Sequence, residues 1–220
     1  MKATVVLPVK RFARAKTRLA EAIGPPARAA LMRAMLGDVL VALDRADEVE
    51  RVILVTGEGR AEKVAMEAAK RVNTPIEVMQ EPDERGHSQA AVLGIVRALS
   101  LGAECSALLP GDCPLLDPAE LDAALARMEP GRVGVIPDRH GTGTNGLLLA
   151  PADAIGPAFG EGSCERHLDR AVRAGHVAAL EELPSLALDL DTPADLEALR
   201  ERVSEEPECA PATAAALAEL

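Results

Sequence analysis

Continuous apolar runs alternate along this chain with stretches in which apolar residues recur at helical spacing. The first run, residues 3–9, is rich in β-branched residues, which is typical of a strand buried on both faces. In residues 27–46 the apolar positions form one helical face, and Pro25 and Pro26 precede it. The same alternation continues to the end of the chain. It predicts further strands at residues 51–56, 75–79, 105–110, 132–137, 145–150 and 186–191 and helices at residues 60–71, 87–100, 118–128, 163–175 and 192–203.

Residues that begin and end helices support these assignments. Asp117 before Pro118 and Thr192 before Pro193 are typical N-caps, and we expect Ser163 to cap the helix that ends at Gly175. Strands that alternate with helices predict a single-domain, Rossmann-like α/β fold, with a mostly parallel central sheet and helices on both faces.

The sequence predicts a domain at residues 1–203, followed by a flexible, acidic and Ala-rich tail at residues 204–220. We expect activity to survive deletion of the tail. A helix that caps a homodimer is the alternative for this segment, and the sequence leaves open whether the protein forms a homodimer.

Composition and charge exclude several classes of protein. The 220 residues carry a net charge of −11 and include two Phe, no Trp and no Tyr, which argues against binding to nucleic acid or an anionic membrane. There is no apolar run of about 18 residues, the length of a membrane-spanning helix. The four cysteines lack metal-binding spacing. These features predict a cytoplasmic protein with reduced thiols.

Unusual residues follow directly after the predicted strands, where the carboxyl ends of a parallel sheet would bring them to one edge. The basic sequence KRFARAKTR follows the first strand, although the first 18 residues contain no acid. This loop occupies the phosphate position of nucleotide-binding sheets, but it matches neither a Walker loop nor a dinucleotide fingerprint. Side-chain cations would therefore hold the phosphates, with Lys16 and Arg18 as the obvious pair. The alternative is a solvated basic loop.

Cations that hold a triphosphate usually act with a divalent metal such as Mg²⁺. Asp112 in PGDCP is a candidate ligand, and Asp189 and Asp191 in LDLD would point to the same face of the predicted strand. A turn before Pro114 and a cap near Thr192 are the structural alternatives for these carboxylates.

Two glycine-rich segments predict a second anionic substrate beside the nucleotide. HGTGTNG contains Thr144 and Asn145, and FGEGS places Gly160 and Ser163 before a helix N-terminus. Mobile turns and helix caps are the alternatives. His140 is a candidate to line the site, whereas we expect His87, His167 and His176 to be surface or helix residues.

The segments LPVKRFARAKTRL, LPGDCPLLDPAEL, PDRHGTGTNGLLLAP, FGEGSCERHL and LDLDTPADLEAL together resemble the 2-phospho-L-lactate or phosphoenolpyruvate guanylyltransferases of deazaflavin coenzyme (F-420) biosynthesis, relatives of the molybdenum-cofactor nucleotidyltransferases. The resemblance covers about residues 5–199. It implies a nucleotidyltransferase that moves GMP from GTP to the phosphate of phosphoenolpyruvate or 2-phospho-L-lactate, with release of diphosphate. It favours phosphoenolpyruvate.

The resemblance also implies roles for individual residues. Thr144, Gly160 and Ser163, with Asn145, would bind the phosphorylated three-carbon acid, and Asp112, Asp189 and Asp191 would bind Mg²⁺. Lys16, Arg18 and Asp112 would be the catalytic residues. The nucleotide would contact Pro8, Lys10, Lys16, Arg18, Glu81, Gly86, Ser88 and Pro110.

One segment departs from the family pattern. GHSQAA, residues 86–91, has Ser88 where the family usually has an amide, which leaves the choice of guanine open. Transfer to 3-phosphoglycerate or to a molybdopterin-type acceptor is an alternative on the same fold. A non-catalytic nucleotide-binding regulatory module is an alternative of another class.

Overall fold

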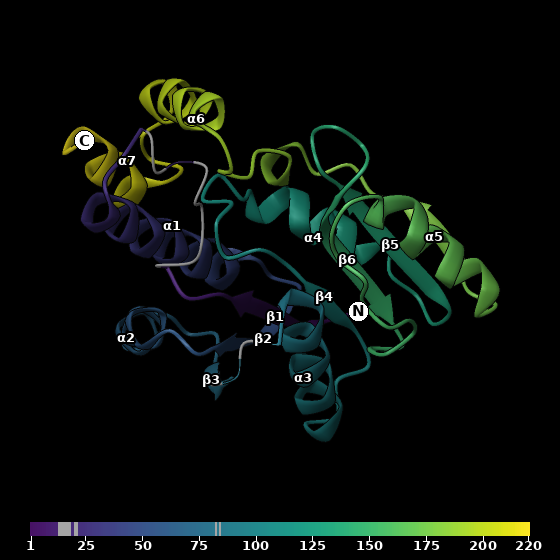
Figure 1. Ribbon diagram of the computed structural model, residues 1–220. Coiled ribbons are helices and arrows are strands. Elements are labelled where there is room, and N and C mark those ends of the chain that lie inside the picture. The colour runs from purple at the N-terminus through teal and green to yellow at the C-terminus, as the bar shows by residue number, and fades with distance from the viewer. Residues whose placement is uncertain (13–18, 20–21, 82, 84) are drawn as a thin grey trace.

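The computed structural model describes residues 1–12, 19, 22–81, 83 and 85–220. Within these residues, seven strands form one sheet in the order β3-β2-β1-β4-β6-β5-β7, and β6 runs antiparallel to both of its neighbours (Figure 1). The α/β architecture with a mostly parallel sheet is confirmed. The strands are β1 (Ala3–Val9), β2 (Val49–Thr56), β3 (Ile76–Gln80), β4 (Ser106–Leu108), β5 (Arg132–Pro137), β6 (Thr144–Ala150) and β7 (Val177–Leu180).

Helices cover both faces of the sheet because the central strands are apolar on both sides. Val5 and Leu7 of β1 belong to one hydrophobic core, and Val6 between them belongs to the other. The first core lies under α1, α2, α4, α6 and α7, and the second lies under α3 and α5 (Figure 1). The helices are α1 (Pro25–Arg45), α2 (Gly59–Ala68), α3 (His87–Ser100), α4 (Pro118–Ala126), α5 (Ser163–Arg173), α6 (Pro193–Glu205) and α7 (Pro211–Ala218).

A close approach at Gly94 fixes the position of α3 on the sheet. A Cβ atom at Gly94 would lie 2.2 Å from a methyl carbon of Val6, so only glycine lets the helix pack this tightly on β1. The N-terminus of α3 is thereby held near the carboxyl end of β1, where Lys10 follows the strand.

The strand expected at residues 186–191 is absent. Pro184–Leu186 forms a 3₁₀ turn, and residues 187–192 continue without strand pairing. The sheet position beside β5 is taken instead by β7, which sequence analysis missed. The strand that the alternation in LALDLD predicted is therefore wrong: these residues are not paired with the sheet.

The C-terminal segment also differs from the flexible tail that we expected. It contains α7, which packs along α1 and buries Thr213 and Leu217 (Figure 1). The carboxylate of Asp38 on α1 accepts hydrogen bonds from the backbone N–H groups of Ala212 (3.1 Å) and Thr213 (2.7 Å) at the start of α7. Burial raises the pKa of Asp38, although the hydrogen bonds from Thr213 and Ala212 oppose that rise.

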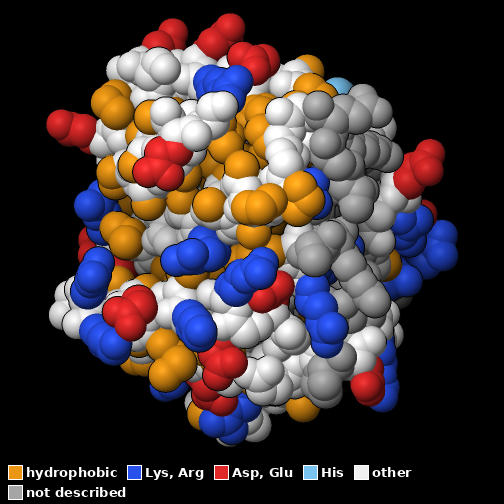
Figure 2. All heavy atoms as spheres, turned by 60° about the vertical axis from the view of Figure 1, so that its left-hand side comes forward, with side chains coloured by type: hydrophobic (Ala, Val, Ile, Leu, Met, Phe, Trp, Pro, Cys, Tyr) orange, Lys and Arg blue, Asp and Glu red, His pale blue; other side chains and the backbone are white. Residues whose placement is uncertain are grey.

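Basic side chains gather outside the basic loop as well. Figure 2 shows Lys and Arg side chains spread over the face formed by α1 and α2. A groove of about 690 Å³ between these helices is lined by Arg33, Arg60, Lys63 and Arg71.

No helix in the described part of the chain is long and apolar enough to cross a membrane.

Candidate active site

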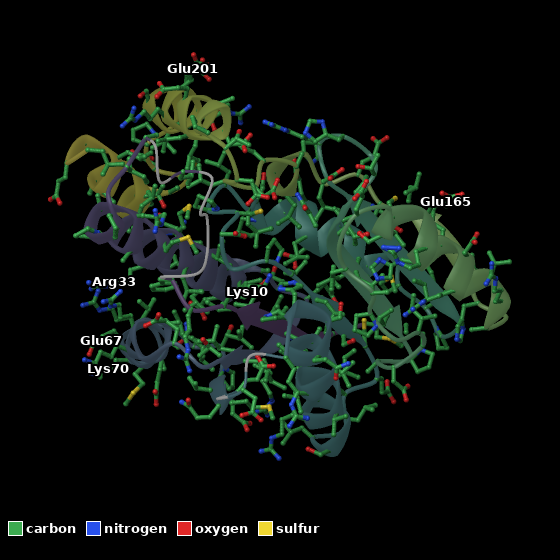
Figure 3. The ribbon with its side chains drawn as sticks, in the orientation of Figure 1. Lys10, Arg33, Glu67, Lys70, Glu165 and Glu201 are labelled. Atoms are coloured by element: carbon green, nitrogen blue, oxygen red, sulfur yellow. The ribbon has the colours of Figure 1, made fainter. Side chains whose placement is uncertain are left out.

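Three adjoining cavities lie where β1, β3 and β4 end and β6 begins. Because β6 is antiparallel, its first residues reach the same edge as the carboxyl ends of the parallel strands. Lys10 and His87 line all three cavities, and Figure 3 shows Lys10 near the middle of the molecule, at the end of β1. The largest of these three, about 660 Å³ and called the largest cavity below, is lined by Lys10, Arg85, Gly86, His87, Ser88, Gln89, Pro110, Asp112, Thr144, Asn145, Phe159, Gly160, Asp189 and Asp191.

Those residues proposed for the nucleotide that the structure describes lie together at this edge. Pro8 lines two smaller cavities of about 200 and 290 Å³, and Glu81 lines the second of these. Lys10, Gly86, Ser88 and Pro110 line the largest cavity. Lys16 and Arg18 fall outside the described residues, so their assignment stays a prediction.

Of the residues expected to bind the phosphorylated acid, Thr144, Asn145 and Gly160 line the largest cavity, but Ser163 does not. The N-cap of α5 is Gly162, with φ 66°, and Ser163 is the first helical residue, so the expected Ser cap is wrong. Ser163 is fully buried, and its hydroxyl oxygen has no hydrogen-bond partner among the described residues. A direct contact with substrate stays a prediction for this residue.

The loop between β5 and β6 is folded around Asp138. The carboxylate of Asp138 accepts hydrogen bonds from the backbone N–H groups of His140 (3.1 Å) and Thr142 (3.0 Å). A Cβ atom at Gly143 would lie 2.5 Å from this carboxylate, which explains why glycine stands there. These two N–H groups, which the glycine-rich pattern suggested for a substrate anion, are therefore already used within the loop.

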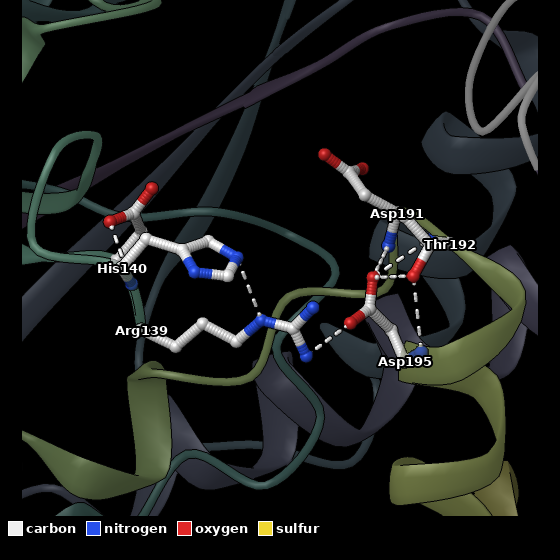
Figure 4. A network of polar contacts seen from close by, with 6 residues as sticks. Arg139, His140, Asp191, Thr192 and Asp195 are labelled. Carbon is white, nitrogen blue, oxygen red and sulfur yellow. Dashed lines mark hydrogen bonds and ion pairs between the residues drawn. The ribbon is translucent and has the colours of Figure 1, made fainter.

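The three candidate metal ligands line the same cavity, although they do not converge through a strand as we expected. Asp191 is held by its backbone: its N–H donates to the carboxylate of Asp195 at 3.0 Å. The backbone N–H and hydroxyl of Thr192 donate to the same oxygen, and Arg139 forms an ion pair with the other oxygen (Figure 4). Asp195 thus connects the loop after β5 with the segment that carries Asp191.

The charge of Asp195 is stabilised in this network. Burial raises the pKa of its carboxyl group, but the hydrogen bonds from Thr192 and Asp191 and the nearby charge of Arg139 outweigh burial. Its pKa therefore lies below the ordinary value, and Asp195 is ionised at neutral pH.

Three carboxylates around one cavity suit Mg²⁺, which prefers oxygen ligands. In the described ranges, no three or more His, Cys, Asp or Glu side chains form a group that could hold a metal ion by themselves. Mg²⁺ is usually bound by one or two carboxylates together with substrate phosphates and water. The donor set therefore fits an ion shared with a triphosphate.

An aromatic side chain that no sequence motif indicated lies beside the residues proposed to bind the phosphorylated acid. The Phe159 ring packs edge-on between His87 (centroids 4.8 Å apart) and His167 (5.3 Å), and the Phe159 N–H donates to the Ser88 hydroxyl at 3.0 Å. His87 and His167 lie in α3 and α5, as expected of helix residues, but His87 lines the cavities and His167 is fully buried. His140 is exposed, bonds to Arg139 and does not line these cavities.

The chain is similar in sequence to known guanylyltransferases over most of its length. A family model described as "Guanylyl transferase CofC like" matches residues 3–201. A phosphoenolpyruvate guanylyltransferase of Conexibacter woesei is 45% identical over 93% of this chain and 90% of its own length. One from Sphaerobacter thermophilus is 38% identical over 90% of this chain and 93% of its own length.

Solved structures show the same fold at low sequence identity. A Desulfovibrio desulfuricans protein, provisionally described as a nucleotide-diphospho-sugar transferase, superposes with a TM-score of 0.74 at 19% identity, over 100% of this chain and 95% of its own. The CMP:2-keto-3-deoxy-manno-octonic acid synthetase complexed with CTP superposes with a TM-score of 0.59 at 16% identity, over 94% of this chain and 100% of its own.

Proposed function

Because the chain belongs to the CofC-like guanylyl transferase family, we propose that it transfers GMP from GTP to the phosphate of phosphoenolpyruvate and releases diphosphate. Two relatives that align over most of their length are named phosphoenolpyruvate guanylyltransferases, which supports this acceptor over 2-phospho-L-lactate. The proposal includes the place of this reaction in the biosynthesis of coenzyme F-420.

The main support for the proposal is a single cavity lined both by charged side chains that suit a metal–triphosphate and by residues that suit the acceptor. Asp112, Asp189 and Asp191 suit a metal–triphosphate, and Lys10 adds a cation beside them. Thr144, the first residue of the antiparallel strand β6, lines the same cavity. Two anionic substrates can therefore meet there with their charges neutralised.

The reaction needs no general base from the protein. An oxygen of the acceptor phosphate, already ionised at neutral pH, attacks the α-phosphorus of GTP and forms the new P–O bond. The bond from the α-phosphorus to the bridging oxygen breaks in line, and that oxygen leaves with the diphosphate. The protein contributes by positioning both phosphates and by stabilising charge on the leaving group.

Each group of residues has a part in this step. Lys10 and the basic loop would bind the triphosphate and the departing diphosphate. Asp112, Asp189 and Asp191 would hold Mg²⁺, which supplies charge neutralisation at the phosphate oxygens. Thr144 and Gly160 would orient the acceptor.

Diphosphate release tests the proposal directly. We would combine GTP, ATP or CTP with phosphoenolpyruvate, 2-phospho-L-lactate or 3-phosphoglycerate, with and without Mg²⁺. Because the activated product can be unstable, parallel reactions would contain the next enzyme and its deazaflavin acceptor. We expect a Mg²⁺-dependent signal for GTP with phosphoenolpyruvate. Diphosphate release with only one of the other acids would identify that acid as the acceptor in place of phosphoenolpyruvate. If no combination releases diphosphate although calorimetry shows that GTP binds, a non-catalytic regulatory module would be favoured.

A further inference from the structure

Thr144 in the cavity is connected to a buried histidine on α5. The Oγ1 atom of Thr144 lies 3.0 Å from Nδ1 of His167, and the backbone N–H of Ala158 donates to Nε2 of the same ring at 2.8 Å. His167 is fully buried, whereas Thr144 lines the largest cavity. The histidine therefore contacts the threonine from the interior of the protein.

The contact with Ala158 determines which ring nitrogen carries the proton. A backbone N–H can only donate, so Nε2 must accept and cannot itself carry hydrogen. The neutral ring then has its proton on Nδ1 and donates it to Oγ1 of Thr144. The hydroxyl of Thr144 accepts this bond, which leaves its own hydrogen for a different partner.

We propose that His167 is a positioning residue that fixes the Thr144 hydroxyl as a hydrogen-bond donor to an anionic oxygen of the phosphorylated acid. The inference rests on the proposed function, in which Thr144 orients the acceptor. A lone threonine hydroxyl could turn its hydrogen away from the substrate or toward a neighbouring acceptor. With Nδ1–H directed at Oγ1, the hydroxyl hydrogen cannot point at the histidine, and the cavity is the side of Thr144 that remains open to an anion.

The surroundings of His167 keep the ring neutral and in place. Burial lowers the pKa of His167 to about 4, and the charges of Arg170 and Arg166 add to that effect. The same two arginines donate to backbone carbonyls of the preceding loop, Arg170 to Gly156 at 2.7 Å and Arg166 to Ala158 at 3.3 Å. Phe159 packs against the ring edge-on. The loop that supplies Ala158 is therefore held against α5 from several sides.

Nitrogen NMR of the wild-type protein tests the tautomer without any need for activity. In a sample with ¹⁵N-labelled histidine, the His167 signals are identified by their absence in the variant His167→Gln. We expect the neutral form with hydrogen on Nδ1, unchanged between pH 6 and pH 8. A ring that carries hydrogen on Nε2, or an imidazolium at pH 6, would overturn the proposal.

Two substitutions then test separately the two hydrogen bonds of this ring, the one that Nδ1 donates and the one that Nε2 accepts. In His167→Asn the amide N–H can replace the Nδ1 donor to Thr144, whereas in His167→Gln the longer side chain can replace the acceptor for Ala158. We expect His167→Gln to raise the KM for phosphoenolpyruvate by about tenfold, with the KM for GTP nearly unchanged, because a hydrogen bond to a charged substrate is weakened. His167→Asn should recover part of this loss.

Thr144→Val provides the matched test of the hydroxyl itself. In the Thr144→Val background, the change from His167 to Gln should have little further effect on the KM for phosphoenolpyruvate, since the group that it positions is gone. Equal effects of His167→Gln on both substrates, or additive effects with Thr144→Val, would contradict the positioning role.

The role of His167 can be tested even if the proposed transfer reaction is wrong. If the wild-type protein transfers no nucleotide, phosphoenolpyruvate binding to wild type and variants is measured by calorimetry, and the same selective loss is expected. If phosphoenolpyruvate does not bind to the wild-type protein, both proposals fail. If one of the two His167 variants fails to fold, the other identifies the His167 signals, and the NMR result for the wild-type ring still decides the tautomer on which the inference depends.

Discussion

Arg139, in the loop after β5, forms an ion pair with Asp195 at the start of α6, and only 3% of the Asp195 side chain is exposed (Figure 4). The pair joins two segments that are 56 positions apart in the sequence, as the residue numbers show. Because Asp195 also binds the backbone of Asp191 and Thr192, this contact supports one wall of the candidate active site. Its loss should affect stability more than the loss of a surface ion pair.

We predict that Arg139→Ala lowers the free energy of unfolding by about 1–2 kcal/mol. The value is below that for a fully buried pair because Arg139 is about a third exposed and Asp195 keeps its other hydrogen bonds. Urea denaturation measures the change. The control is Arg200→Ala, whose ion pair with Glu197 is exposed and should contribute less than about 0.5 kcal/mol. Equal changes in the two variants would contradict the structural importance of the Arg139 pair.

Removing one candidate metal ligand should abolish most activity without unfolding the protein. We predict that Asp112→Asn lowers kcat by at least about 100-fold and raises the Mg²⁺ concentration needed for half-maximal rate, since a charged ligand of the metal–triphosphate is lost. Asp117→Asn is a matched control: Asp117 caps α4, and Asn caps helices equally well. If Asp112→Asn behaves like this control, the metal assignment is wrong.

Lys10 and the basic loop should act mainly on the nucleotide. We predict that Lys10→Ala, Lys16→Ala and Arg18→Ala each raise the KM for GTP by about tenfold, because each removes a charged contact with phosphate. Lys63→Ala, an exposed lysine on α2 outside the cavities at the sheet edge, is the control. Initial rates over a range of GTP concentrations measure the effect, and unchanged kinetics would exclude the residue concerned from binding the triphosphate.

The helix α7 gives a prediction that the sequence pattern alone would have missed. Deleting residues 207–220 should expose the apolar surface of α1 and leave Asp38 without Ala212 and Thr213, so the melting temperature should fall by several degrees. Activity at low temperature should be retained, because none of the deleted residues lines the cavities at the sheet edge. Thermal melts and rates at low temperature test both parts, and an unchanged melting temperature would show that α7 contributes little.

The sequence predicted the elements whose signals are local. The buried run of β1, the capping aspartate before α4 and the Thr192 cap of α6 each depend on a few neighbouring residues, and all three are confirmed. The fold class followed from the alternation of such elements. Pro8, Lys10 and Pro110 could be placed in one region because they lie at or just after the ends of strands, and these ends meet at one edge.

What the sequence could not predict depends on contacts between distant segments. The helix α7 has no amphipathic pattern of its own and is positioned by Asp38, about 170 residues earlier. The strand β7 is only four residues long, and two of these are alanines, so its pattern is too short to recognise. His167 has no sequence signal that separates it from a surface histidine, and its role became visible only beside Thr144 and Ala158.

The buried ring of His167 also predicts how stability depends on pH. Its pKa is about 4 in the folded protein and about 6.5 in the unfolded chain, so the folded state binds fewer protons between these values. The stability associated with the neutral ring is complete above pH 6.5 and is lost as pH falls toward 4, by roughly 3 kcal/mol. We expect the difference in unfolding free energy between wild type and His167→Gln to shrink by that order between pH 7 and pH 4. His176→Gln, outside this hydrogen-bond network, is the control. Parallel pH curves for wild type and His167→Gln, measured by urea denaturation, would mean that His167 titrates alike in the folded and unfolded states.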